Sequence, residues 1–201
     1  MKNIKVIKTG IDVSKILKQL LDNPNDWNAI NKNTDIQRNG IHIKKYYENI
    51  PKTIHSGIQI MIPITLGVVK NSDDDIYESM LYRNTEYYQK YTEIVNWLKN
   101  NGYENHARAA FLKLPPRALW PRHFDPGIYH INNDRYHLSI QGRYTYEVGD
   151  EQITVEPGTH FWFDNKQYHT ARNIEDFDRI TFVFDIPIKE AVNYDKLSSG
   201  N

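Results

Sequence analysis

The amino-acid sequence predicts a mainly β domain, a sandwich or barrel flanked by helices, and three observations lead to this prediction. From residue 107 onward, short runs rich in β-branched and aromatic residues are separated by turn residues. Strands that recur at such regular spacing favour a sandwich or barrel over parallel βαβ units. The earlier half mixes helical and strand-like patterns. At 201 residues the chain suits one domain, 1–201, with a sizeable core, and two would be cramped.

Two segments of the first half have the periodicity of amphipathic helices. Residues 13–21 carry aliphatic side chains at helical spacing, and residues 22–26, rich in Asn, Asp and Pro, indicate a turn. Residues 85–100 form the clearest helix in the chain, closed by an Asn/Gly C-terminus at Asn101 and Gly102. We expect the tyrosines of this helix to pack against a sheet.

Strand patterns fill the second half and one stretch of the first. Residues 56–69 predict one or two strands, and the acidic cluster 73–75 predicts a loop or the start of a helix. The later strands are expected at 109–114, 136–140, 144–148, 152–155, 160–163 and 179–186. Turns are expected at Gly142, Gly149-Asp150 and Pro157-Gly158.

Composition excludes several function classes. The 25 basic residues balance the 25 acidic ones, so no overall field would recruit nucleic acid or an anionic membrane. The chain has no cysteine, which excludes disulfides, thiolate zinc sites, iron–sulfur clusters and a cysteine nucleophile. Any metal must therefore rest on His, Asp or Glu, which favours iron, manganese, nickel or a His-rich zinc site.

No segment has the pattern of a signal peptide or a membrane span. The first ten residues lack an apolar core and a small-residue cleavage site. The longest apolar run, 58–69, is interrupted by Gln59, Pro63 and Thr65 and is too short to cross a bilayer. We therefore expect a cytoplasmic protein without a membrane or nucleic-acid partner.

The most informative feature is His123-Phe124-Asp125, together with the later His169. In a strand, residues i and i+2 project to the same side, so His123 and Asp125 can reach one ion while His169 approaches from another strand. Two imidazoles and one carboxylate are the ligands of non-haem Fe(II), and they leave positions open for a bidentate oxoacid and dioxygen. An isolated His-x-Asp triplet also occurs by chance in many proteins.

The surrounding residues make a resemblance recognisable. Between Trp120 and Asp185, about a third of the chain, the sequence resembles the aspartyl/asparaginyl β-hydroxylase family of Fe(II)- and 2-oxoglutarate-dependent oxygenases. The matching motifs are, in order, His123-x-Asp125, Arg135-Tyr136-His137-Leu138, Pro157-Gly158 before Phe163-Asp164-Asn165, His169 and Arg179. The part of the chain before residue 106 resembles no family that we can name.

The resemblance implies a fold and its layout. Members have a cupin-like double-stranded β-helix, a jelly-roll barrel of two antiparallel sheets. Residues 106–188 would form this barrel and hold the metal, and the elements within 1–105 would pack on its outside. The reaction would use O2 and convert 2-oxoglutarate to succinate and CO2 while an unactivated C–H is hydroxylated.

The resemblance also implies roles for individual residues. His123 and His169 would bind iron, and Asp125 would complete the set, whereas some members have Gly there and use only two protein ligands. The complete set is similar to the branch that includes proline hydroxylases, which favours small molecules over epidermal-growth-factor-type protein substrates. Arg179 would pair with the distal carboxylate of 2-oxoglutarate.

Two further residues of the motifs would lie beside the co-substrate. Arg135 would hold its proximal end or the carboxylate of the substrate, and His137 would line the same pocket. Each arginine also has a simpler interpretation. Arg179 could form a surface ion pair with Asp178 or Asp176, and Asp134 could neutralise Arg135.

Other residues near the motifs are weaker candidates for substrate binding. Trp120 and Trp162 could wall the pocket, although aromatic residues beside strands usually belong to the core. A second group could contact a polar or anionic substrate, or could be rim charges and a turn residue: Arg122, Arg172 and Asn165. We expect His130 to lie in a loop and His160 to point outward from a strand.

Two alternatives to the hydroxylase remain open at this stage. One is a cupin-type metal enzyme that does not use 2-oxoglutarate, and the other is a ligand-binding cupin module without turnover. The substrate could be a free amino acid, a small carboxylate, a peptide residue or a lipid-linked acyl chain. The sequence predicts no oligomeric state.

Overall fold

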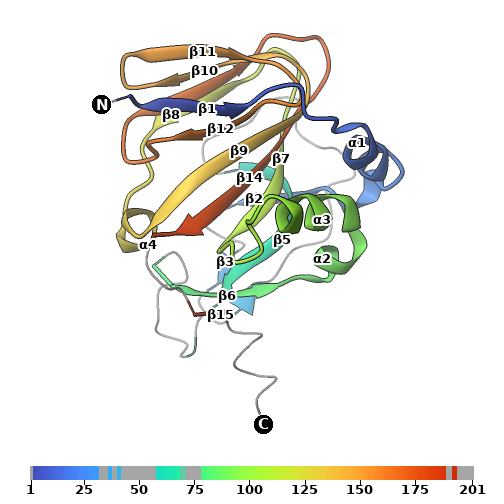
Figure 1. Cartoon of the computed structure of the whole chain (residues 1–201), viewed down its shortest axis with the longest axis vertical. Helices are drawn as coiled ribbons and strands as arrows, with labels where there is room; N and C mark the ends of the chain where they lie inside the picture. The colour runs from blue at the N-terminus through green and yellow to red at the C-terminus, as the bar shows by residue number, and fades with distance from the viewer. Residues whose placement is uncertain are drawn as a thin grey trace.

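The computed structural model describes residues 2–31, 36–37, 40–41, 58–68, 70, 78–188 and 192–193. Two β-sheets face each other in this part of the chain, and helices cover the outer side of the larger one (Figure 1). Strand pairing is antiparallel in both sheets, except for one parallel pair at the edge of the larger sheet. The predicted mainly β, double-stranded β-helix fold with flanking helices is confirmed.

The larger sheet draws strands from both halves of the chain. Its order is β1 (Ile4–Lys8), β12 (His160–Phe163), β9 (Asn133–Gln141), β14 (Arg179–Pro187), β7 (Ala109–Leu114), β5 (Ile58–Val68), β6 (Leu81–Asn84) and β15 (Val192–Asn193). β2 (Asn28–Asn31) pairs with β5 beside this path. Strands from the first 105 residues therefore extend the sheet itself; the expected division at residue 105 stays a prediction.

The smaller sheet is built from four strands of the second half of the chain, which are interspersed in sequence with strands of the larger sheet. Its order is β11 (Glu151–Val155), β10 (Tyr144–Val148), β13 (His169–Asn173) and β8 (Leu119–His123). Aromatic and aliphatic side chains of this sheet pack against Phe161 and Phe163 of β12, which closes the interior between the sheets. A separate short pair is formed by β3 (Ile36–Gln37) and β4 (Gly40–Ile41).

Helices α1 (Ser14–Leu21) and α3 (Thr92–Asn100) bury their apolar sides against the outer face of the larger sheet. This cluster joins residues of α1, α2 (Glu86–Lys90) and α3 to Ile60, Ile62 and Ile64 of β5 and to Phe111, Phe182 and Phe184 of β7 and β14. The helix predicted at 13–21 is confirmed, and the turn after it contains the 3-10 helix Pro24–Asp26. No helix in the described residues has the length and hydropathy needed to cross a lipid bilayer.

The single helix predicted at 85–100 is two helices, α2 (Glu86–Lys90) and α3, which meet at Tyr91. Tyr91 leaves the helical conformation (φ −92°, ψ 63°), and its buried phenol donates a hydrogen bond to the Asp26 carboxylate at 2.8 Å. Tyr87 and Ile94, on either side of the break, lie in the same core. The apolar periodicity continues through the break, so it could not indicate the change of direction.

The strand predictions of the second half are confirmed, with small changes at the ends. The stretch 56–69 contains one strand, β5, and residues 56, 57, 69 and 73–75 lie outside the described residues. β5 contains Pro63, and its register with β7 shifts between Pro63 and Thr65 because proline has no N–H to donate to a neighbouring strand. The turn at Gly158 has φ +78°, and a Cβ there would lie 2.3 Å from the Ile11 carbonyl oxygen.

Strands β9 and β14 are buried on both faces, and this positions the site. Leu138 and Phe182 point to the helices, whereas His137 contacts Tyr146 of the smaller sheet. The pairing of Asp185 with Arg135 and of Val183 with His137 places the polar side chains of both strands in one row. The interior between the sheets is therefore partly polar.

Truncation of the helix-facing core should be costly. Phe111 is fully buried and packs on Tyr91 and Phe182, so we expect Phe111→Ala to lower the free energy of unfolding by about 3–5 kcal/mol. Urea unfolding followed by circular dichroism measures this. Phe177 is 50% exposed and is the matched control, since Phe177→Ala should change stability by less than about 0.5 kcal/mol. Equal losses in both variants would contradict the assignment of this core.

Candidate metal centre

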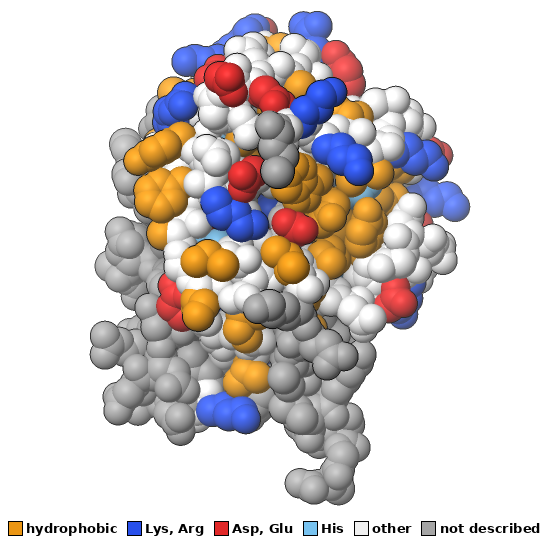
Figure 2. Space-filling model, turned by 60° about the vertical axis from the view of Figure 1, so that its left-hand side comes forward, with side chains coloured by type: hydrophobic (Ala, Val, Ile, Leu, Met, Phe, Trp, Pro, Cys, Tyr) orange, Lys and Arg blue, Asp and Glu red, His pale blue; other side chains and the backbone are white. Residues whose placement is uncertain are grey.

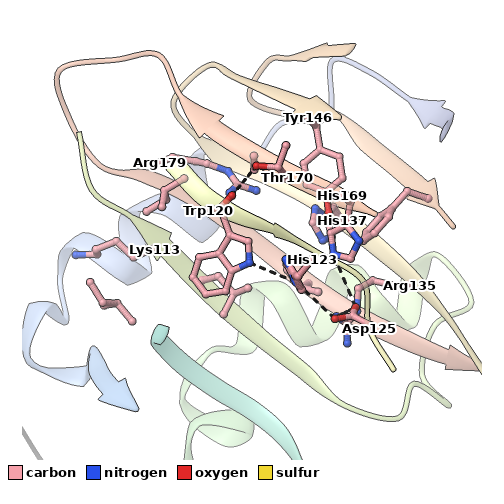
Figure 3. A pocket seen from close by; sticks show the side chains of 16 residues that line it. Lys113, Trp120, His123, Asp125, Arg135, His137, Tyr146, His169, Thr170 and Arg179 are labelled. Atoms are coloured by element: carbon pink, nitrogen blue, oxygen red, sulfur yellow. Dashed lines mark hydrogen bonds and ion pairs between the residues drawn. The ribbon is translucent and has the colours of Figure 1, made fainter. Parts of the chain in front are cut away.

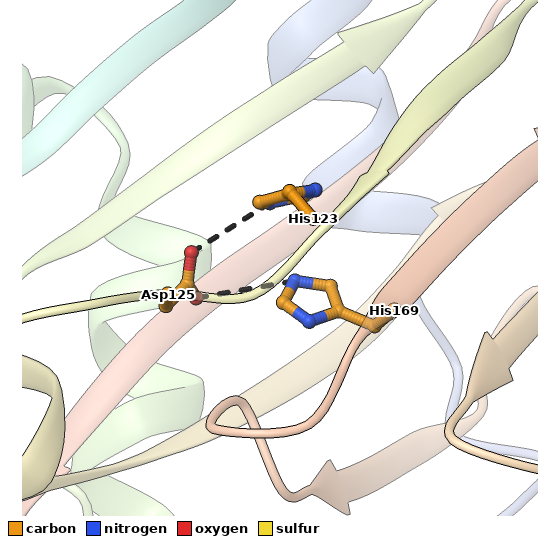
Figure 4. Close-up of side chains that lie close together, drawn as sticks. All are labelled: His123, Asp125 and His169. Carbon is orange, nitrogen blue, oxygen red and sulfur yellow. Dashed lines mark ion pairs between the residues drawn. The ribbon is translucent and has the colours of Figure 1, made fainter.

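His123, Asp125 and His169 come together at one end of the smaller sheet (Figure 4). His123 is the last residue of β8 and pairs with His169, the first residue of β13. Asp125 follows β8, and its backbone N–H donates to the Asn165 carbonyl at 3.0 Å. One ligand atom from each of the three residues lies within 4.8 Å of the other two. The group therefore has the dimensions of a site for a single ion.

The imidazoles are oriented for metal binding by their backbone partners. Nδ1 of His123 donates to the Pro121 carbonyl at 2.8 Å, and Nδ1 of His169 donates to the Gln167 carbonyl at 2.9 Å. Each Nε2 is left with its lone pair on the side of Asp125, at 3.6 Å and 4.0 Å from the carboxylate oxygens. Carbonyl partners of this kind fix the tautomer of ligating histidines. The donor set fits a divalent ion such as Fe(II).

The electrostatics of the site favour the protonation states that a metal requires. Burial opposes the charge on Asp125, but the neighbouring Arg135 and histidines outweigh it and hold the pKa of this carboxyl well below its usual range. Burial lowers the pKa of His169 to about 4, despite the opposing effect of Asp125. A carboxylate and a neutral imidazole are the forms that coordinate metals.

Arg135 is held by two carboxylates. Its Nε and Nη2 donate to Asp185 at 2.7 and 2.9 Å, and its Nη1 donates to Asp125 Oδ2 at 2.5 Å. Asp134, the neighbour expected to neutralise it, instead lies 3.7 Å from the amine of Lys166. That interpretation of Arg135 was wrong because adjacent residues of a strand point to opposite faces of the sheet.

A cavity runs from the metal ligands between the two sheets (Figure 3). Its polar lining includes the ligands, Arg135, His137, Thr170 and Arg179, with Lys113 towards the far end. Its apolar lining includes Trp120, Tyr146, Phe163 and Leu114. Figure 3 shows Arg179 and His137 approaching the same space from the larger sheet.

Arg179 is a buried cation in this cavity. It is 7% exposed, and its guanidinium lies 3.8 Å above the centre of the Tyr144 ring. Its Nε has no hydrogen-bond partner among the described residues. The alternative of a surface ion pair is wrong, because Asp178 pairs with Lys113 at 3.3 Å and Asp176 pairs with Arg117 at 2.7 Å. A guanidinium out of water without a carboxylate partner suits an anionic ligand.

The other predicted site residues divide between the cavity and its surroundings. His137 lines the cavity, 5% exposed, and burial and the nearby Arg179 hold its pKa well below the usual range. Trp120 also lines it, and its indole N–H approaches Nε2 of His123 at 3.4 Å. Four candidates are not among its lining residues: Trp162, Arg122, Asn165 and Arg172. Their predicted contacts with a substrate stay predictions.

Those four candidates lie in different places. Trp162 is half-buried in β12, opposite Lys5 and Tyr136, and Arg172 is exposed in β13. Arg122 donates to the Gly149 carbonyl at 3.2 Å. Asn165 is fully buried, and its side chain contacts His130 at 3.3 Å while its carbonyl holds the backbone of Asp125. Asn165 therefore supports the loop that carries a metal ligand.

Of the two predictions about histidines, one was wrong. His160 points to the outer face of the larger sheet, as expected, but it is 3% exposed and contacts the Tyr103 hydroxyl at 2.9 Å, because helices cover that face. His130 belongs to the short helix α4 (Ile128–Ile131) rather than to a loop. Burial lowers the pKa of His130 to about 4, with Arg135 adding to the effect.

Sequence reasoning missed several residues that build the site. Tyr146 stacks on His169, and Thr170 donates to the Trp120 carbonyl at 2.5 Å, which ties β13 to β8. Asp185 was hidden in a strand of apolar residues. Its position could have indicated the site: Asp185 alternates along the strand with Arg179, Thr181 and Val183, so its side chain lies on the same face as Arg179.

The loop residues next to the ligands are exposed and aromatic. Phe124 and Tyr168 are 43% and 53% exposed, and their rings meet edge to face with centroids 5.2 Å apart. Figure 2 shows a face of the molecule on which hydrophobic side chains gather around a few charged ones. Apolar surface of this kind is typical of the surroundings of a binding site.

The family model for aspartyl/asparaginyl β-hydroxylases matches residues 25–188. The chain belongs to this family. The match extends well into the first half of the chain, which resembled no family in our reading of the motifs. A comparison with curated proteins finds no match.

Solved structures similar to the β-helix are cupins and related proteins. One is a cupin domain of Cnp3 from Schizosaccharomyces pombe, 15% identical, with a TM-score of 0.35; the match covers 40% of this chain and 55% of that one. Another is a predicted oxalate decarboxylase from Thermotoga maritima, 12% identical, with a TM-score of 0.38, covering 66% and 83% of the two chains. A third is an RmlC-like cupin family protein from Methanocaldococcus jannaschii, 18% identical, with a TM-score of 0.35, covering 41% and 72%. These similarities concern the fold alone.

Acid should weaken the folded state of the metal-free protein. Unfolded histidines titrate near pH 6.5, whereas the pKa of His169 in the folded protein is lowered to about 4. Between these values the unfolded state binds more protons, so the free energy of unfolding falls as the pH falls, by up to roughly 1.4 kcal/mol per pH unit for each such histidine. Urea unfolding with a chelator present, at several pH values, measures the slope. His169→Asn should give a shallower slope, and an unchanged slope would contradict the assignment.

Proposed function

We propose that this family member is an Fe(II)- and 2-oxoglutarate-dependent hydroxylase that acts on an amino acid, a small carboxylate or a peptide residue. One observation carries the proposal: a His-Asp-His group and a buried arginine that pairs with no carboxylate of the described residues line the same cavity. The first fits a metal with open positions, and the second fits the free end of a dicarboxylate.

The spacing along β10 supports a short dicarboxylate. Arg179 lies over the ring of Tyr144, and His169 stacks on Tyr146 with an interplanar angle of 19°. The two tyrosine rings are neighbours on one face of the strand, with centroids 6.4 Å apart. An anion held by Arg179 could therefore reach the metal group with its other end, provided that its two charged ends are separated by a short carbon chain.

Each part of the chain has a defined task in this proposal. His123, Asp125 and His169 would hold the iron, which would supply O2 activation when bound. Arg179 would pair with the distal carboxylate of 2-oxoglutarate. Arg135 and His137 line the same cavity beside the metal group, and the rings of Tyr146 and Phe163 would keep water away from the reacting atoms. Expectations of a single domain, a cytoplasmic location and no nucleic-acid partner stay predictions.

Loss of the Arg179 guanidinium should impair co-substrate binding specifically. We expect Arg179→Met to raise KM for 2-oxoglutarate roughly 100-fold or more, since it removes charge-assisted hydrogen bonds to a carboxylate. Succinate formation measures this, and anaerobic addition of 2-oxoglutarate to the Fe(II) protein should give a metal-to-ligand charge-transfer band. Arg117→Ala, which removes an exposed pair with Asp176 and an exposed hydrogen bond to the Ile174 carbonyl, is the control.

The same experiment separates the alternative functions. A cupin enzyme that does not use 2-oxoglutarate would show no charge-transfer band and no succinate. A binding module would bind a ligand without succinate formation. Either result would contradict the proposed activity.

Metal binding should also be visible in the fluorescence of Trp120. The indole N–H of Trp120 approaches the Nε2 lone pair that a metal would use, so binding must displace this contact. Addition of Fe(II) or Co(II) should quench the emission, with saturation near one equivalent. Trp120→Phe should still bind metal but lose most of the change, although three other tryptophans remain. Saturable quenching that survives in Asp125→Ala would contradict the predicted ligand set.

A further inference from the structure

Arg135 and Asp185 form a buried ion pair directly behind the metal ligand Asp125. Asp185 is 2% exposed, and it accepts hydrogen bonds from both Nε and Nη2 of Arg135. The third arm of the guanidinium, Nη1, reaches Oδ2 of Asp125. Oδ1 of the same carboxylate faces Nε2 of His123 at 3.6 Å, and Oδ2 lies 4.0 Å from Nε2 of His169. Arg135 thus holds Oδ2 of Asp125, and Oδ1 is directed to the metal position.

The network continues behind Asp185 and fixes it in turn. The Tyr129 hydroxyl donates to Asp185 Oδ2 at 2.9 Å, and the guanidinium of Arg108 packs on the Tyr129 ring at 3.6 Å from its centre. Tyr129 is 1% exposed. Asp185 is therefore held from two sides, by a tyrosine and by Arg135, and cannot move without breaking buried hydrogen bonds.

We propose that Asp185 is a positioning residue for the metal site: it neutralises and aims Arg135, so that Arg135 orients Asp125 without repelling the metal. This inference rests on the proposed function, because it concerns the same site. An arginine in contact with a carboxylate ligand places a positive charge close to a divalent cation. A second carboxylate on the far side of the guanidinium offsets that charge.

This arrangement gives the two arginines of the cavity different tasks. In Arg135, each of the three nitrogen atoms donates to a carboxylate of the protein. Arg179 has its guanidinium against an aromatic face, and the neighbouring aspartates pair with other cations. Arg135 acts on the metal through Asp125, and Arg179 is the cation left for the anionic co-substrate.

The test is the affinity of the metal-free protein for Co(II), without co-substrate, read from the visible spectrum of the bound ion. Asp185→Asn keeps the shape but removes the charge, and it should raise the dissociation constant for Co(II) by roughly 10- to 100-fold and shift the spectrum. Asp185→Glu should restore most of the affinity. The double variant Arg135→Gln/Asp185→Asn should bind Co(II) more tightly than Asp185→Asn, since it removes the uncompensated charge.

A matched control separates positioning from a general effect on folding. Asp26 also accepts a tyrosine hydroxyl and pairs with a cation, Lys90, but it lies on the helical side of the larger sheet. Asp26→Asn should leave the Co(II) affinity unchanged. Thermal unfolding and circular dichroism of each variant confirm a folded state. If Asp185→Asn does not fold, Tyr129→Phe takes its place, and a severalfold weaker affinity is expected because Asp185 loses its second donor.

Three results would overturn the inference. An unchanged Co(II) affinity in folded Asp185→Asn would show that Arg135 needs no compensation. A double variant no better than the single one would show that charge is not the cause. Absence of saturable Co(II) binding in the unchanged protein would remove the metal site itself, and with it the proposed function. The first two leave the proposed function intact, so the two failures are distinguishable.

Discussion

Charged side chains lie between the two sheets, where water is scarce, and each therefore needs a partner. A guanidinium or carboxylate that loses its water without gaining a partner is strongly destabilising. Asp125, Arg135 and Asp185 meet this constraint among themselves, in one line from the metal position to the larger sheet. Arg179 meets it only in part, through the ring of Tyr144. The two arginines therefore differ in how fully the protein balances their charge, and this difference suits them to different tasks in the cavity.

The two-sided burial of β9 and β14 makes this arrangement possible. One face of each strand packs against the helices and supplies the apolar contacts that stabilise the sheet. The other face is then available for polar residues, because the core does not depend on it. The register between the strands places Asp185 opposite Arg135, so the ion pair forms from a cross-strand contact. The position of the metal ligand Asp125 thus depends on two paired strands and not only on the loop that carries it.

Much of the fold and part of the site could be predicted from the sequence, for definable physical reasons. Strand runs bounded by Gly142 and by Pro157-Gly158 are local signals, and both turns form as expected. The His-x-Asp motif is also local, since i and i+2 spacing brings two side chains to one side. His169 is distant in sequence, and it could be assigned to the same site because the motifs of the family follow one another in a fixed order.

What could not be predicted depends on contacts between distant segments. The break at Tyr91 follows from a hydrogen bond to Asp26, 65 residues away in sequence. The burial of His160 follows from helices that cover the outer face of the larger sheet, a face that two sheets without helices would leave in water. The partner of Arg135 is separated from it by 50 residues, and its sequence neighbour Asp134 was the obvious but incorrect choice. Periodicity describes one segment at a time and contains no information on such pairs.

The contrast between the two arginines extends this reasoning from structure to chemistry. Both belong to the motifs that the family shares, and the resemblance implies that both lie beside the co-substrate. Their surroundings in the structure differ. The guanidinium of Arg135 pairs with Asp125 on one side and with Asp185 on the other, so its charge is balanced before any ligand enters. Within the described part of the chain no carboxylate pairs with Arg179, and a dianion that bridges Arg179 and a divalent metal would balance both charges. A neutral ligand would leave the Arg179 guanidinium without a counter-charge, so under the proposed function we expect the cavity to favour an anion over a neutral ligand of the same size.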